Sequence, residues 1–225
     1  MVSRRTQDID ERPNIVIIIA DDLTWRDVGA YGNSDVHTPN IDRLAEEGLL
    51  FTRAFTAAPM CSPSRMNLYT GLYPVRSGAY PNHSYVKGGV KSIFHYLREL
   101  GYRVGLTGKE HVAPRKAFPY EYLGDMDFGR VRDFVQRNRE QPFFLVVASH
   151  QPHVPWNKGN PGKYDPKKLK LPPYFVDTPA TRRKLAEYYA EIEYLDGEVG
   201  RTMQILKGAG EADSTLVLFT TEQGA

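Results

Sequence analysis

Two pairs of oxygen-bearing side chains follow apolar runs that lie far apart in the chain. Asp21-Asp22 come directly after the β-branched run from Asn14 to Ala20, and Glu222-Gln223 follow the last apolar run. Three carboxylates and an amide offer only oxygen ligands, which suit Ca²⁺ or Mg²⁺ better than Zn²⁺. One acidic pair alone is typical of a turn or a helix cap. A second pair after another predicted strand favours a metal site.

The only cysteine, Cys61, lies in a segment that could carry nucleophilic chemistry. A lone cysteine is usually a small buried apolar residue, but the neighbours Ser62 to Arg65 are not typical of a core. A helix predicted to begin here would attract an anion to its N-terminus, and Arg65 would do the same one turn later. These residues fit a nucleophile that faces an anionic substrate. They leave open a thiolate enzyme, a phosphate site and a rarer chemistry.

Basic and histidine side chains follow two further predicted strands. Lys109 and His111 could hold an anion and a proton, and His153 lies in a rigid turn between prolines. His150 is equally compatible with a structural hydrogen bond. The remaining histidines, His37, His83 and His95, have no context that indicates a function. His83, however, lies in the loop after the Cys61 helix.

The elements that must position these residues alternate between strands and helices. Apolar runs predict strands at residues 14–20, 102–107, 143–148 and 214–220, and helical spacing with capping residues predicts helices from Thr38-Pro39 to Gly48, over 92–100, and from Thr178-Pro179 to Gly208 and Gly210. This alternation predicts an α/β fold, with an open, mostly parallel sheet flanked by helices on both faces. In such sheets ligands bind beyond the carboxyl ends of the strands, where all four polar clusters are expected.

Composition excludes several classes of function. The chain has 225 residues, 41% of them hydrophobic, and a net charge of +2 with scattered basic residues, so we expect a soluble protein without a nucleic-acid or membrane partner. A single cysteine allows no intrachain disulfide. The first apolar run is too short for a signal peptide, which predicts a cytoplasmic protein as written, or a periplasmic or secreted one if the N-terminus is trimmed. Residues 154–177 are expected to form a long surface excursion.

The segment Cys61-Ser62-Pro63-Ser64-Arg65, with its continuation to Pro74, resembles the sulfatase signature. Further segments resemble the same family in the family's order: Asn14 to Leu23, Thr38 to Leu44, Thr107 to His111, and Pro152 to Pro155. Shorter strings around Lys109 and over residues 173–180 look most like its sulfamidase and heparan-sulfatase branch. The resemblance implies an alkaline-phosphatase-like fold, with residues 1–225 as the N-terminal portion of the catalytic domain and the family's C-terminal subdomain outside this chain.

The resemblance also implies a cofactor set. In the family the cysteine equivalent to Cys61 is oxidised to formylglycine by a formylglycine-generating enzyme, which would be a maturation partner. Asp21, Asp22, Glu222 and Gln223 would hold one divalent cation together with the hydrated aldehyde, most often Ca²⁺ and alternatively Mg²⁺ or Mn²⁺. The family usually has Asp followed by Asn or His at the last pair, so the Glu and Gln of this chain each add one methylene.

Catalytic roles follow from the resemblance in the same way. One hydroxyl of the hydrated aldehyde made from Cys61 would attack sulfur, and the second would later expel sulfate. Arg65 would hold the diol, Lys109 would bind a sulfate oxygen, His111 would handle the proton of the diol, and His153 would bind or protonate the leaving side.

The function that the resemblance implies is hydrolysis of a sulfate ester or sulfamate, with a sulfated glycan or small molecule as substrate. A phosphonate or phosphate-ester hydrolase of the same superfamily is an alternative, because the residues present do not separate tetrahedral anions of similar size. A truncated, non-catalytic homologue that binds sulfated glycans is the other alternative.

Overall fold

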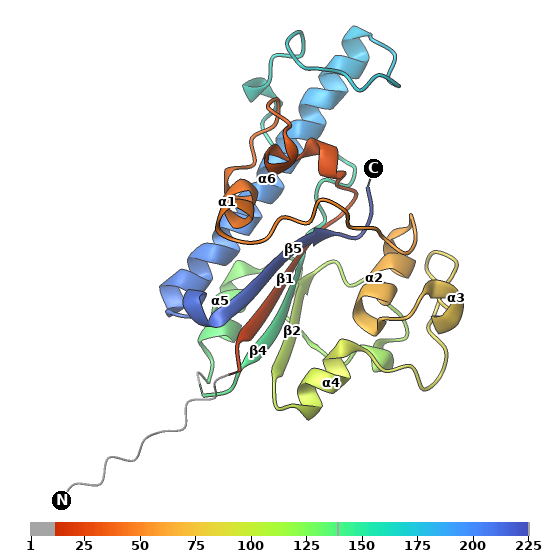
Figure 1. The fold of residues 1–225 in the computed structure, drawn as a ribbon, viewed down its shortest axis with the longest axis vertical. Helices are drawn as coiled ribbons and strands as arrows, with labels where there is room; N and C mark the ends of the chain where they lie inside the picture. Colours follow the sequence, from red (N-terminus) through yellow and green to blue (C-terminus); the bar gives the residue numbers. More distant parts are fainter. Residues whose placement is uncertain (1–11, 139, 225) are drawn as a thin grey trace, which may run out of the picture.

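The computed structural model describes residues 12–138 and 140–224, which form one sheet with helices on both of its faces (Figure 1). The strands are β1 (Asn14–Ala20), β2 (Arg103–Gly108), β3 (Glu121–Tyr122), β4 (Phe143–Ala148) and β5 (Thr215–Thr221). The helices are α1 (Pro39–Glu47), α2 (Cys61–Thr70), α3 (Pro74–Ser77), α4 (Ile93–Glu99), α5 (Phe128–Gln136) and α6 (Pro179–Ala209).

The sheet has the strand order β3-β2-β4-β1-β5, and every pairing in it is parallel. β1 lies between β4 and β5, and β4 is buried along its whole length. A strand covered on both faces needs apolar side chains at successive positions, which is why residues 143–148 carry no polar side chain. The predicted α/β class and parallel sheet are confirmed.

The two faces of the sheet pack against different helices and form separate cores (Figure 1). On one face Val16, Ile18 and the inward side of α6 pack together with residues of α1 and α5. On the other face Ile19 packs with Met66 of α2 and Phe94 of α4. Because α2 is held in the second core, its first turn lies beside the carboxyl end of β1.

The predicted strands and helices match the structure closely, but one cap differs. The Thr38 side chain makes no capping bond to α1; it accepts a hydrogen bond from the Gly29 amide and donates one to Asp42. The first amides of α1, those of Asn40 and Ile41, donate instead to the carboxylate of Asp196 in α6, at 2.9 and 2.8 Å. A partner so far away in the chain leaves no local pattern in the sequence.

α6 continues through Gly208 and ends at Gly210, whose positive φ of 73° closes the helix. The structure also contains α5 and the short strand β3, for which the sequence analysis made no prediction. No helix among residues 12–138 and 140–224 combines the length and apolar character needed to cross a membrane.

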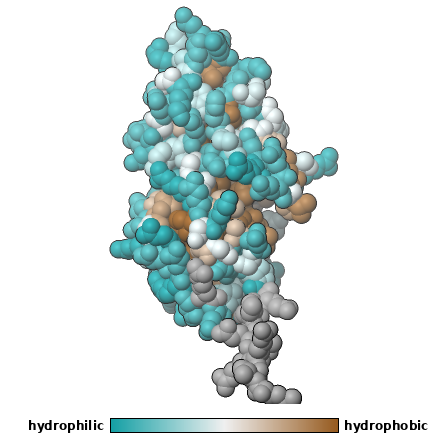
Figure 2. Space-filling view, turned by 90° about the vertical axis from the view of Figure 1, so that its left-hand side faces the viewer, coloured by the Kyte–Doolittle hydropathy of each residue, from teal (hydrophilic) through white to brown (hydrophobic). Residues whose placement is uncertain are grey.

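The excursion over residues 154–177 is mostly exposed, as predicted, but it is anchored to the helix behind it. The buried carboxylate of Glu191 in α6 accepts hydrogen bonds from the amides of Lys158 and Gly159, at 2.9 and 3.2 Å. Tyr164 and Leu169 are buried in the core on that face. Figure 2, which looks onto the left-hand side of Figure 1, shows a mostly hydrophilic surface interrupted by hydrophobic patches.

The buried carboxylate of Glu198 in α6 binds the residue that follows β4. Ser149, the residue after β4, donates from its hydroxyl to Glu198 of α6 at 2.6 Å and accepts from the Gln151 amide at 2.9 Å. Burial raises the pKa of Glu198 to about 7, although the Ser149 hydroxyl opposes this shift. Glu198 therefore binds a proton more tightly in the folded chain than in the unfolded chain.

We expect the free energy of unfolding to depend on pH through Glu198. Because its pKa is raised, its contribution is fully present below about pH 4.5 and is lost as pH rises to about 7. Relative to Glu198→Gln, the wild type should therefore lose about 3 kcal/mol over this interval. Urea unfolding of both proteins from pH 4 to 8 measures the difference; a difference that does not change with pH would contradict a protonated Glu198.

Candidate metal and catalytic site

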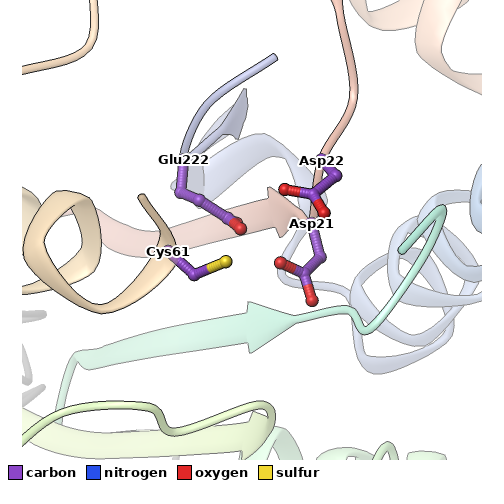
Figure 3. Close-up of side chains that lie close together, drawn as sticks. All are labelled: Asp21, Asp22, Cys61 and Glu222. Atoms are coloured by element: carbon purple, nitrogen blue, oxygen red, sulfur yellow. The ribbon is translucent and has the colours of Figure 1, made fainter. Parts of the chain in front are cut away.

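Four potential ligands converge at the carboxyl edge of the sheet (Figure 3). Ligand atoms of Asp21, Asp22, Cys61 and Glu222 all lie within 4.8 Å of one another. The two aspartates follow β1, Glu222 follows the neighbouring β5, and Cys61 is the first residue of α2. Parallel pairing of β1 with β5 brings residues two hundred positions apart to the same edge. The predicted clustering of the two acidic pairs is what the structure shows.

Two basic side chains balance part of this negative charge. Arg65 is fully buried, and its Nη2 atom lies 2.7 Å from a carboxylate oxygen of Glu222 and 3.6 Å from one of Asp21. Its Nη1 atom donates to the backbone carbonyl of Lys109 at 3.2 Å. The Lys109 ammonium group forms an ion pair with Asp21. Arg65 lies one turn after Cys61 in α2, which is why the spacing of the segment places both at the acidic group.

The close approach of the carboxyl groups of Asp21 and Glu222 shifts the pKa values of both. Burial raises the pKa of Glu222 to about 9, and a hydrogen bond to Asp21 adds to the rise. Burial also acts to raise the pKa of Asp21, but the hydrogen bond with Glu222 and the positive charges of Arg65 and Lys109 outweigh it and lower this pKa. Without a further positive charge, Glu222 therefore keeps a proton at neutral pH.

The side chains fit a divalent cation. Three buried oxygen atoms, Oδ1 of Asp21, Oε1 of Glu222 and Oε1 of Gln223, have no hydrogen-bond partner among the described residues. The amide nitrogen of Gln223 donates to Asp22 at 2.7 Å and lies 3.6 Å from the Cys61 sulfur, so Gln223 belongs to the same cluster. Oxygen atoms left without partners in an acidic group are the donors that Ca²⁺ and Mg²⁺ prefer. The longer Glu and Gln side chains thus still reach the cluster.

Cys61 is not suited to act as a thiolate. Burial and the surrounding carboxylates raise its pKa to about 11, against the opposing charge of Lys109. The thiol is therefore neutral at physiological pH, although it lies at the beginning of α2, where a helix N-terminus favours negative charge. Without a further positive charge, these surroundings disfavour the thiolate form of Cys61.

The predicted histidines divide into two groups. Nε2 of His153 lies 3.6 Å from Asp22, so His153 borders the acidic cluster. His111 lies near Lys109 and Arg65; burial and these charges lower its pKa to about 4, so its ring is neutral at pH 7. His150 instead pairs with Asp125 at 2.6 Å, a contact outside the cluster.

Some residues of the site carried no recognised signal in the sequence. Thr56 and Ser64 both donate to the backbone carbonyl of Glu222, which holds the segment after β5 against α2. Ser64 lies inside the signature segment, so its position was a signal that could have been used. His83 contacts His111, and its place in the loop after the Cys61 helix was the only indication of this role.

A model of the sulfatase family matches residues 13–135 and 119–225. The chain belongs to the sulfatase family. It is 34% identical over 233 residues to the ulvan-active sulfatase of Formosa agariphila, a match that covers 96% of this chain and 45% of that protein. It is also 34% identical over 253 residues to the human N-sulphoglucosamine sulphohydrolase, covering 94% of this chain and 50% of that protein. The chain therefore spans about half the length of these relatives.

The fold agrees with this family. A solved structure of a putative sulfatase from Bacteroides fragilis superimposes with a TM-score of 0.82 at 24% identity, covering 99% of this chain and 64% of that one. The predicted alkaline-phosphatase-like architecture is thereby confirmed for the part of the family's fold that this chain contains.

We expect divalent cations to stabilise the purified protein. A cation at about 100 times its Kd should raise the free energy of unfolding by about 2.7 kcal/mol, because it binds only the folded cluster. Asp22→Asn removes one negative charge from the cluster and should strongly reduce this increase. Melting curves with and without Ca²⁺, Mg²⁺ or Mn²⁺ provide the measurement.

Asp177→Asn is the matched control, since Asp177 is an exposed carboxylate that pairs with Arg182 and lies outside the cluster. This variant should keep the full increase. The same melting temperature for the wild type with and without each of the three cations would contradict a metal site.

Proposed function

We propose that this chain is the catalytic part of a sulfatase that hydrolyses a sulfate ester or sulfamate of a sulfated glycan, with a nucleophile made from Cys61. One observation carries the proposal: Cys61 is a buried thiol whose sulfur lies within 4.8 Å of carboxylate oxygens of Asp21, Asp22 and Glu222. The groups around Cys61 are hard oxygen ligands, so an oxygen nucleophile formed at this position would suit them better than a thiol would.

The proposed groups supply the chemistry as follows. Formylglycine at position 61 would, as its hydrate, provide the attacking hydroxyl and a second hydroxyl for release of sulfate. A divalent cation held by Asp21, Asp22, Glu222 and Gln223 would stabilise negative charge on the transferring sulfuryl group.

The chain's own side chains bind and orient the substrate and move protons. The ammonium group of Lys109 reaches the cluster from the end of β2 and would bind a sulfate oxygen. Arg65 is held rigidly by Glu222 and by the carbonyl of Lys109, so it keeps a fixed positive charge beside position 61. The neutral ring of His111 would accept a proton, and His153, at the outer side of Asp22, would protonate the leaving oxygen or nitrogen.

The glycan substrate is proposed from the names of the relatives. One is named an ulvan-active sulfatase and the other an N-sulphoglucosamine sulphohydrolase, so both O-sulfate and N-sulfate remain candidate substrates. Sequence strings around Lys109 favour the sulfamidase branch. Parallel assays with N-sulfoglucosamine and with a 6-O-sulfated sugar would separate the two bonds.

Replacing Cys61 should abolish turnover. We expect Cys61→Ala to lower kcat/KM for an aryl sulfate by at least about 10³-fold, because the residue provides the nucleophile. In protein produced together with a formylglycine-generating enzyme, peptide mass spectrometry across position 61 should show an aldehyde in place of the thiol. Full activity of Cys61→Ala, or of protein whose Cys61 stays entirely unmodified, would rule out the proposed nucleophile.

An aryl phosphonate assayed beside the aryl sulfate distinguishes the related hydrolase class. The proposal expects a higher kcat/KM for the sulfate. A higher value for the phosphonate would assign the chain's reaction to phosphonate esters instead.

A further inference from the structure

The ring nitrogens of two histidines meet at the edge of the site. Nε2 of His111 lies 2.9 Å from Nδ1 of His83, with the ring centroids 4.6 Å apart and the ring planes inclined by 43°. This distance is that of a hydrogen bond, so one of the two nitrogens carries the shared proton. The other nitrogen of His111, Nδ1, is buried and has no hydrogen-bond partner among the described residues.

We propose that His83 is a positioning residue for His111. Nδ1 of His83 accepts a hydrogen bond from the Nε2–H group of His111, so Nδ1 of His111 is left as the unprotonated base. This inference rests on the proposed function, because it concerns the residue that handles a proton in that reaction. His83 itself contacts no reacting group.

The choice of tautomer follows from the environment of His111. If the proton were on Nδ1 of His111, a buried N–H group would have no acceptor among the described residues, which is unfavourable. With the proton on Nε2 of His111, this N–H group donates a hydrogen bond to His83. Nδ1 of His111 is then an acceptor that can bind a hydroxyl group of the substrate or the nucleophile. Buried donors without partners are rarer than buried acceptors without partners, so the second arrangement is favoured.

The backbone holds His83 in place for this contact. His83 has a φ of 58°, a left-handed conformation that few residue types adopt readily. The preceding residue, Asn82, accepts a hydrogen bond from the amide of Ser62 in the first turn of α2. The amide of Val86 donates to the carbonyl of Ala113 at 2.9 Å. The loop is thus bonded on one side to the helix that begins at the nucleophile position, and on the other to the segment that follows His111.

The proton balance of the proposed step is simple. A hydroxyl group gives its proton to Nδ1 of His111, an N–H bond forms there, and the O–H bond breaks. Nε2 keeps its own proton and its hydrogen bond to His83 throughout. The hydrogen bond to His83 fixes the plane of the His111 ring throughout the step.

Two substitutions at position 83 test this role. His83→Gly removes the ring and tolerates the positive φ, so it should leave the fold intact. His83→Asn also tolerates that conformation and places its side-chain oxygen near the position of the lost Nδ1 atom, so it can still accept the proton of His111. Melting temperatures of both variants, compared with the wild type, check that the loop is retained.

Kinetics of the matured, cation-loaded protein with an aryl sulfate provide the first measurement. We expect His83→Gly to lower kcat roughly ten- to hundredfold with little change in KM, the size of effect that loss of an orienting partner has at other histidines. His83→Asn should recover most of the loss. Wild-type kcat in His83→Gly, or equal losses in the two variants, would overturn the proposal.

Imidazole ¹⁵N chemical shifts of labelled protein provide a second measurement that does not depend on turnover. The shifts should identify His111 as the Nε2–H tautomer in the wild type and in His83→Asn, and as a mixture in His83→Gly. An Nδ1–H tautomer of His111 in the wild type would overturn the inference. If no variant or wild-type protein hydrolyses the sulfate, the proposed function fails, and the tautomer alone still decides the role of His83.

Discussion

Arg65 lies fully buried between the carboxylates of Asp21 and Glu222, and the rest of the site is arranged around this contact. A buried guanidinium group is tolerated only where carboxylates offset its desolvation, and buried carboxylates likewise need positive charge nearby. Arg65 and Lys109 supply two positive charges against three carboxylates, an excess of negative charge that raises the pKa of Glu222 and that a divalent cation would offset in place of the Glu222 proton. That excess, and the oxygen atoms that have no partner, are the physical reason to expect a divalent cation there.

The parallel sheet makes this arrangement possible. β1 ends at the two aspartates, β5 ends at Glu222, and the two strands are neighbours. At the carboxyl ends of parallel strands, backbone groups and side chains meet at one edge of the sheet. Beyond the last paired residues, these groups take no part in the hydrogen bonds of the sheet and can bind a ligand. Opposite this edge, α2 begins at Cys61 and is held by hydrogen bonds from Thr56 and Ser64 to the carbonyl of Glu222. Two side-chain hydroxyls thus hold the backbone of Glu222 against the segment that contains Cys61.

Two histidines at this edge of the sheet, His153 and His111, lie in different surroundings. His153 lies beside Asp22, while burial, together with the nearby charge of Lys109, lowers the pKa of His111 and keeps its ring neutral. A neutral ring is a useful base only if its proton is on the correct nitrogen, and this requires a hydrogen-bond partner. In the loop between α3 and α4, His83 lies within hydrogen-bond distance of His111, so a residue outside the signature segment contacts the site.

Most of the elements could be predicted from the sequence, because the apolar runs of a buried parallel strand and the capping residues of a helix are local properties. The bounds of β1 and β4 agree with the prediction to the residue. The cap of α1 could not be predicted, because its acceptor, Asp196, is more than 150 positions away. The same is true of the anchoring of residues 154–177, where Glu191 accepts the amides of a loop whose own sequence indicates only exposure.

By itself, the sequence determined the family, the types of ligand and the strand ends that carry them. These follow from the signature around Cys61 and from acidic pairs placed after apolar runs, which are patterns within short segments. Only the tertiary structure decided that Glu222 and Gln223, despite their longer side chains, reach Asp21 and Asp22. It also decided that burial and nearby carboxylates raise the pKa of the Cys61 thiol and that the His83 and His111 rings are in contact. Proton affinity and hydrogen bonding depend on burial and on neighbours brought together by the fold, which no spacing along the chain records.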